Sequence, residues 1–280
     1  MVRASVRSMS EERGFEDTEL PGARFRQVRM PEASFRLVDL SRARMHNVLL
    51  PGARLTGVVL EGAVIDGDIR GLVVNGVEVT PLVEAALDRR YPDRALMRPT
   101  DADGFRTAWA RLGELWAGTV ERARALEARS SGAVHASVDG EWSFVETLRH
   151  LVMATTDAWV GRVLLGDPAA YHPLGIPFEE AQSLPGLPYA ADARPTLAEV
   201  LQVREGRRAQ VTSVLRDLTD ERLAERTKPV EGPGWPPARD YLVREVLGIV
   251  VNEEWEHRLF AERDLALLDS RLAEGGVGHG

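Results

Sequence analysis

A period of five runs through the first part of the chain, and it constrains the fold more than any other feature of the sequence. Reading every fifth residue gives an unbroken apolar series: Phe15, Leu20, Phe25, Met30, Phe35, Leu40, Met45, Leu50, Leu55, Leu60 and Ile65. Two positions before these residues, alanine alternates with valine from Ala23 to Ala63. Helices and strands do not repeat at this spacing. The pattern instead predicts a square coil, with one repeat on each side and both series pointing toward the axis.

This segment resembles the pentapeptide-repeat family, and the resemblance implies a short right-handed quadrilateral β-helix. The repeats would form about two and a half coils, a small number for a stacked structure. The register ends at Arg70, and residues 71–79 are expected to lead out of the coil. Some members of the family mimic DNA with a strongly acidic coil, but here arginines balance the acidic residues between Phe15 and Arg70. We therefore interpret the segment as a structural appendage or docking surface.

Helical periodicity replaces the period of five beyond Pro99. Ser143 with Glu146, and Thr196 with Glu199, fit capping boxes that would begin two of the helices. Four amphipathic helices of about 20 residues or more predict a helix bundle. The connections between them are unequal, and two long Pro-rich loops could wall a pocket at one end of the bundle.

The expected architecture is therefore α+β and multidomain, with a β-helix followed by a four-helix bundle. It divides into a disordered N-terminus at residues 1–14, the pentapeptide-repeat β-helix at 15–79, a linker with a short helix at 80–100, and the four-helix bundle at 101–274.

Composition excludes several classes of function. A net charge of -8 argues against a nucleic-acid partner, since phosphate binding needs a basic surface. The chain has no apolar run near the ~20 residues of a membrane span, and its N-terminal residues lack the apolar core of a signal peptide. A cytoplasmic location is expected. Because the chain has no cysteine, it supplies neither a thiol nucleophile nor a thiolate ligand.

The last predicted helix carries two polar residues on an apolar face. Val246, Val250, Glu253 and His257 follow one another at spacings of three and four. A buried carboxylate needs a compensating partner, and a metal ion shared with His257 would provide one because the two side chains are neighbours on the helix. A buried Glu–His hydrogen bond, or a helix end open to solvent, would explain the same spacing. Glu254 is the alternative ligand.

The second predicted helix offers a third ligand. His150 lies roughly opposite the apolar face formed by Phe144, Leu148 and Val152. Asp157 shares the side of His150, and its carboxylate could accept a hydrogen bond from the His150 ring, as partners of metal-bound histidines do.

These residues also resemble a known family. The segment Trp142-Ser143-Phe144 to Leu148-Arg149-His150-Leu151, with the residues up to Trp159, resembles the second helix of DinB-superfamily bundles, and Glu253-Glu254-Trp255-Glu256-His257 with Arg263-Asp264-Leu265 resembles the fourth. The resemblance covers residues 101–271. The branch that includes mycothiol-dependent maleylpyruvate isomerase has His, Glu and His as metal ligands. This implies that His150, Glu253 and His257 hold the metal, and it selects Glu253 over Glu254.

A catalytic role for such a site is the leading hypothesis. Two imidazoles and a carboxylate leave an open position on zinc, and nickel or iron is also compatible. The resemblance implies a metal-dependent thiol transferase or isomerase, with mycothiol or another low-molecular-weight thiol as cofactor and a small-molecule electrophile as partner. Arg258 or Arg263 could receive an anionic group, and His172 is a candidate pocket residue; no catalytic residue is assigned.

The rival hypothesis is a non-catalytic, stress-related module that binds metal or acts as a scaffold. In that case the metal would be structural or absent. Either protein could form a homodimer.

Overall fold

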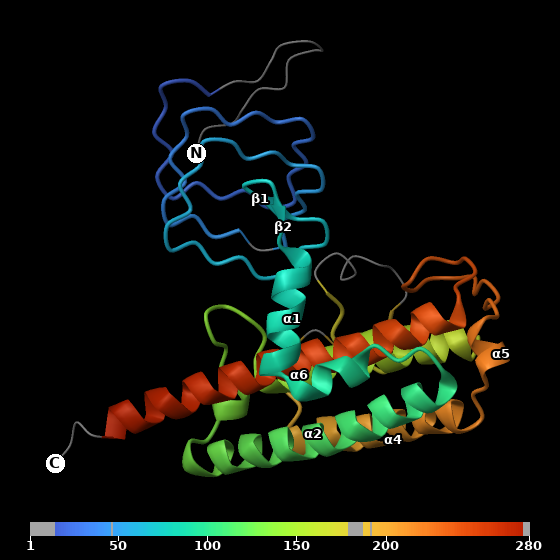
Figure 1. The fold of residues 1–280 in the computed structure, drawn as a ribbon. Helices are drawn as coiled ribbons and strands as arrows, with labels where there is room; N and C mark the ends of the chain where they lie inside the picture. Colours follow the sequence, from blue (N-terminus) through green and yellow to red (C-terminus); the bar gives the residue numbers. More distant parts are fainter. Residues whose placement is uncertain (1–14, 46, 179–186, 191, 277–280) are drawn as a thin grey trace. The chain divides into compact units, whose positions relative to one another are not determined.

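The computed structural model describes residues 15–45, 47–178, 187–190 and 192–276, and the chain divides into two compact units, Met1–Asp66 and Gly67–Gly280. Figure 1 shows the first unit as stacked coils and the second as mainly helical. The N-terminal residues 1–14, expected to be disordered, lie outside the described residues.

Regular corners shape the repeat unit. Every tenth residue begins a turn in which an alanine amide donates to the carbonyl three residues earlier, as from Ala23 to Leu20 (3.1 Å) and from Ala53 to Leu50 (3.1 Å). The third residue of these turns has a positive φ, for example 70° at Gly22 and 71° at Gly52. A type II turn requires a positive φ at its third residue and favours the pair Pro-Gly at its centre. The turns at Gly22 and Gly52 both contain this pair. A second set of positive φ angles begins at Asp17 and recurs every ten residues. These residues form the corners that lie between the type II turns.

The apolar series of the repeats is not buried. Phe15, Phe25 and Phe35 are 75%, 62% and 64% exposed, although the sequence predicted that they point to the axis and pack there. Among the described residues 15–66, the main-chain hydrogen bonds are the turn bonds, and no strand is formed. Among the described residues, successive coils are therefore not joined by a ladder of main-chain hydrogen bonds.

A hairpin and two short helices begin the second unit. Strands β1 (Val73–Val74) and β2 (Val77–Glu78) pair antiparallel, with Val74 opposite Val77. Helix α1 (Thr80–Arg90) and the 3-10 helix η1 (Pro92–Met97) follow. The Arg94 side chain joins them, because it donates to Glu84 (2.6 Å) and Asp88 (2.7 Å) of α1.

Four long helical stretches form the rest of the unit. They are α2 (Ala102–Arg129), α3 (Phe144–Leu151) continued by the π-helix η3 (Val152–Leu164), α4 (Leu197–Arg216) and α6 (Val243–Gly276); the short helices η2 (Ala133–His135) and α5 (Asp220–Leu223) lie between them. The capping boxes expected at Ser143 and Thr196 are both present and begin α3 and α4. The π-helical stretch was not predicted.

These helices share an apolar interior that is made of separate clusters. One cluster joins Leu112 of α2, Val160 of η3, Val211 of α4 and Val250 of α6. Another joins α2, α3, α4 and α6 through Trp116, Leu148, Val200 and Leu265. Helix α6 packs along η3, α2 and α3, so the polar residues on its apolar face meet the second helical stretch. In the part of the chain that the structure describes, no helix is both long and apolar enough to cross a bilayer.

Candidate metal centre

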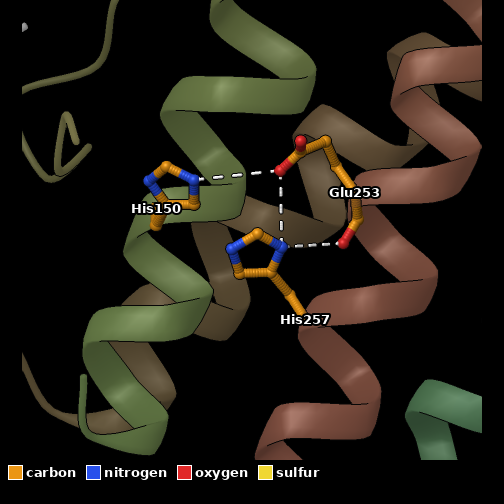
Figure 2. A group of neighbouring side chains, drawn as sticks. All are labelled: His150, Glu253 and His257. Carbon is orange, nitrogen blue, oxygen red and sulfur yellow. Dashed lines mark hydrogen bonds and ion pairs between the residues drawn. The ribbon is translucent and has the colours of Figure 1, made fainter. Parts of the chain in front are cut away.

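Three side chains from two helices converge at one point inside the second unit (Figure 2). His150 comes from α3, and Glu253 and His257 lie one turn apart on α6. The Glu253 carboxylate is 4.0 Å from His150 Nε2 and 3.4 Å from His257 Nδ1. One ligand atom from each residue lies within 4.8 Å of the others. Ligands of one zinc ion, each about 2.0–2.2 Å from it, need slightly closer spacing, which a small side-chain movement supplies.

Main-chain carbonyls fix the orientation of both imidazole rings. His150 Nδ1 lies 3.2 Å from the carbonyl oxygen of Ile176, and His257 Nδ1 lies 2.9 Å from that of Glu253. A carbonyl accepts only from a protonated nitrogen, so these contacts assign the proton of each neutral ring to Nδ1. In each ring Nε2 then keeps its lone pair. Metal-binding histidines are commonly held this way, with the other ring nitrogen donating to a carbonyl.

Burial sets the protonation of the site. His150 is 5% exposed. Burial and, to a smaller extent, the nearby His257 together lower its pKa to about 3, although the Ile176 carbonyl opposes the shift. Burial also raises the pKa of Glu253, while His257 acts against this effect. His150 is therefore neutral at physiological pH, and Glu253 lacks a full compensating charge. A divalent cation fits this donor set because neutral imidazole and carboxylate are both good ligands.

The neighbouring Glu254 has a different role. Its side chain is fully buried, and its carboxylate lies 2.8 Å from Arg204 and 3.7 Å from Arg208. The Thr155 hydroxyl also donates to it, at 3.3 Å. Burial alone would raise the pKa of Glu254, but the two arginines outweigh this effect and hold it below its ordinary value. Glu254 thus belongs to a buried ion-pair network, whereas Glu253 faces the histidines.

Trp142 forms one side of the site, which the sequence analysis did not predict. Its ring centroid lies 4.3 Å from that of His150 and 6.4 Å from that of His257. It also lines a narrow pocket with Thr147 and Asp264. The available signal was its position directly before the Ser143 cap, since a side chain there often folds back over the first turns of the helix.

Asp157 does not have the position that the sequence predicted. The acceptor beside His150 Nδ1 is the Ile176 carbonyl. Asp157 instead accepts from the amide of His172 (2.7 Å) and pairs with Arg207 (2.8 Å). The prediction assumed an α-helix, in which residues seven apart lie on one face. From Val152 the helix is a π-helix, whose wider turn rotates Asp157 away from His150.

The three candidates for substrate binding lie in different places. Arg258 stacks over Trp255 (5.2 Å) and lines a separate groove between α2 and α6. Arg263 pairs with Asp264 (2.7 Å) and lies over Phe260, whose ring contacts His257. His172 lies in the loop after η3, where its Nδ1 accepts from the amide of Leu174 (3.1 Å).

Comparison with known protein families agrees with this architecture. The model of the DinB superfamily matches residues 79–261. A second model, of pentapeptide repeats, matches residues 18–57 in 8 copies. The chain thus belongs to the DinB superfamily and carries pentapeptide repeats before the DinB domain. No curated protein and no solved structure gave a match.

The two glutamates should differ in their contribution to stability. Glu254→Gln leaves Arg204 and Arg208 without the buried carboxylate, so we expect the free energy of unfolding to fall by about 3 kcal/mol or more. Glu253→Gln, in metal-free protein, should change it by less than about 1 kcal/mol because no arginine among the described residues forms an ion pair with Glu253. Urea unfolding of both variants measures this. Equal losses would contradict the division of roles.

Acid should destabilise the metal-free protein through His150. Its ordinary pKa is 6.5 and its folded-state pKa is about 3, so below pH 6.5 the unfolded chain binds a proton that the folded chain does not. The stability is fully present above the unfolded pKa and declines as the pH falls, by at most about 1.4 kcal/mol per pH unit.

Urea unfolding between pH 7 and pH 4.5 measures this slope, and His150→Gln should make it shallower. His135→Gln, at an exposed histidine outside the site, provides the comparison, and the larger change in slope is expected in His150→Gln. The same slope in His150→Gln as in the wild type would refute the assignment.

Proposed function

We propose that the DinB domain binds one divalent metal ion through His150, Glu253 and His257, and that it is a metal-dependent thiol transferase or isomerase. The observation that carries the proposal is the convergence of two imidazoles and one carboxylate, with one ligand atom from each within 4.8 Å of the others. Three ligands of this kind leave at least one position for an exchangeable group, as catalytic zinc sites require. Zinc fits best, and nickel or iron suits the same donors.

The thiol must come from a small molecule. A bound divalent metal would supply the charge that deprotonates a thiol and holds it as thiolate. The chain has no cysteine of its own. The resemblance to the branch of mycothiol-dependent maleylpyruvate isomerase, carried by the positions of His150, Glu253 and His257, supports mycothiol or a similar thiol. The second reactant would then be a small-molecule electrophile.

The chain's own residues provide a site of restricted hydration. Trp142 covers one side of the two histidine rings, and Phe260 contacts His257 with ring centroids 5.9 Å apart. Apolar walls strengthen electrostatic interactions at a site and limit competing reaction with water. Arg263, which lies over Phe260, is a candidate for receiving an anionic group on the substrate.

The finer architecture is part of the proposal. The corners at every fifth residue and the family match support a right-handed quadrilateral coil for the repeats. The interior shared by α2, α3 with η3, α4 and α6 supports a four-helix bundle.

A non-catalytic metal-binding or scaffolding module is the second candidate. The observation in its favour is the exposed apolar surface of the repeat unit, where Leu37 is 100% and Leu49 is 89% exposed. Contiguous exposed apolar surface commonly marks a site of protein interaction.

Elemental analysis tests the metal proposal. Protein purified without a metal-binding tag should contain about one equivalent of a divalent metal, as one closed set of ligands predicts. The metal should be lost from Glu253→Ala and from His257→Ala, because each removes one of three ligands. His135→Ala, at an exposed histidine outside the site, is the matched control and should retain it.

A thiol titration separates the two candidates. Adding 2-mercaptoethanol to the cobalt-loaded protein should produce a thiolate-to-metal absorption band. A wild-type protein that stays empty when zinc or nickel is supplied would refute the metal site. A loaded protein that never develops the band would refute thiol transfer and leave the scaffolding candidate.

A further inference from the structure

A buried arginine next to the first metal ligand holds a loop against α3. Arg149 is 1% exposed, and its guanidinium donates to the main-chain carbonyls of Leu174 (2.8 Å), Ala193 (2.8 Å) and Ala190 (2.9 Å). Residues 170–178, which we call the loop strap, contain the first of these acceptors. A buried guanidinium is costly unless its donors are satisfied, and its planar fork holds several acceptors in one geometry.

The loop strap also makes two contacts that lead directly to His150. The amide of Ile176 donates to the main-chain carbonyl of Arg149 (3.2 Å). The carbonyl of the same residue lies 3.2 Å from His150 Nδ1. The side chain of Arg149 therefore holds Leu174, and the main-chain carbonyl of Arg149 holds Ile176. Together these two contacts set the position of the Ile176 carbonyl.

We propose that Arg149 is a positioning residue of the metal centre: it fixes the loop strap so that the Ile176 carbonyl holds Nδ1–H of His150 and directs Nε2 toward Glu253 and His257. This inference rests on the proposed metal-binding function. Arg149 itself touches neither the metal nor a substrate and acts through the loop strap. Partners of this kind commonly change metal affinity ten- to hundredfold when they are removed.

The protein contains a matched control for this role. Arg162 of η3 is also 1% exposed, and it donates to the main-chain carbonyls of Val230 (2.6 Å), Gly232 (3.0 Å) and Pro233 (3.2 Å). It therefore makes the same type of contact with a second loop. That loop also contacts the loop strap, because the Tyr171 hydroxyl donates to the carbonyl of Trp235 (2.6 Å) and the rings of Phe178 and Trp235 lie 5.0 Å apart, but among the described contacts it has none with Ile176 or His150.

The test compares Arg149→Lys with Arg162→Lys. Lysine keeps the charge but cannot hold three carbonyls in one plane. Zinc affinity is measured by competition with a chromophoric chelator, thermal unfolding reports stability, and nitrogen-15 NMR of the metal-free protein reports which ring nitrogen of His150 carries the proton.

We expect both variants to lose thermal stability. Arg149→Lys should also bind zinc ten- to hundredfold more weakly and show a mixture of His150 tautomers, whereas Arg162→Lys should retain zinc affinity within about twofold. If Arg149→Lys loses only stability, as its control does, then Arg149 is merely structural and the inference is wrong.

A gentler variant keeps the test decisive if Arg149→Lys does not fold. A Cβ added at Gly175 would lie 3.1 Å from Met153 Cβ and 3.2 Å from the carbonyl oxygen of His172. Gly175→Ala therefore shifts the loop strap while Arg149 remains, and a severalfold loss of zinc affinity is expected. Unchanged affinity and tautomer would overturn the inference.

Failure of the underlying function is distinguishable. If the wild-type protein binds no zinc, the metal proposal fails, and the NMR measurement alone decides the inference. Retention of the Nδ1–H tautomer in Arg149→Lys or Gly175→Ala would then refute it, and its loss would support it.

Discussion

Compensation of two adjacent glutamate charges on α6, one buried and one half-buried, determines the organisation of the site. Two adjacent glutamates meet this constraint differently. Glu254 is neutralised by Arg204 and Arg208 inside the protein, which ties α4 to α6. Glu253 instead faces two imidazoles, and burial holds one of them neutral. A carboxylate beside a neutral imidazole has unused capacity for a cation, and this makes the arrangement suited to a metal rather than to an internal ion pair.

Most of the helical architecture could be predicted from the sequence. Capping boxes located the starts of α3 and α4, and the spacing of three and four placed Glu253 and His257 on one face of α6. The position of Asp157 could not be predicted, because periodicity assumes an α-helix and the stretch after Leu151 is π-helical. The role of Ile176 as the partner of His150 could not be predicted either, because its contact is made by a main-chain carbonyl, which the side-chain sequence does not reveal. Arg149 carried no signal because its partners are also carbonyls.

The repeat unit illustrates a different limit of sequence analysis. The period of five correctly indicated pentapeptide repeats, and Pro-Gly pairs account for the turns at Gly22 and Gly52. Periodicity specifies which side chains share a side of the coil, but burial also depends on how closely successive coils approach. Between described residues the coils form no ladder of hydrogen bonds, and the apolar series stays exposed.

X-ray absorption spectroscopy of the metal-loaded protein tests the central claim most directly. The account predicts two imidazole nitrogens and a carboxylate oxygen at about 2.0–2.2 Å from zinc, with a sulfur neighbour at about 2.3 Å after a small thiol is added. Absence of the multiple scattering that imidazole ligands produce would contradict the assignment of His150 and His257. A ligand shell that thiol leaves unchanged would contradict the proposed chemistry.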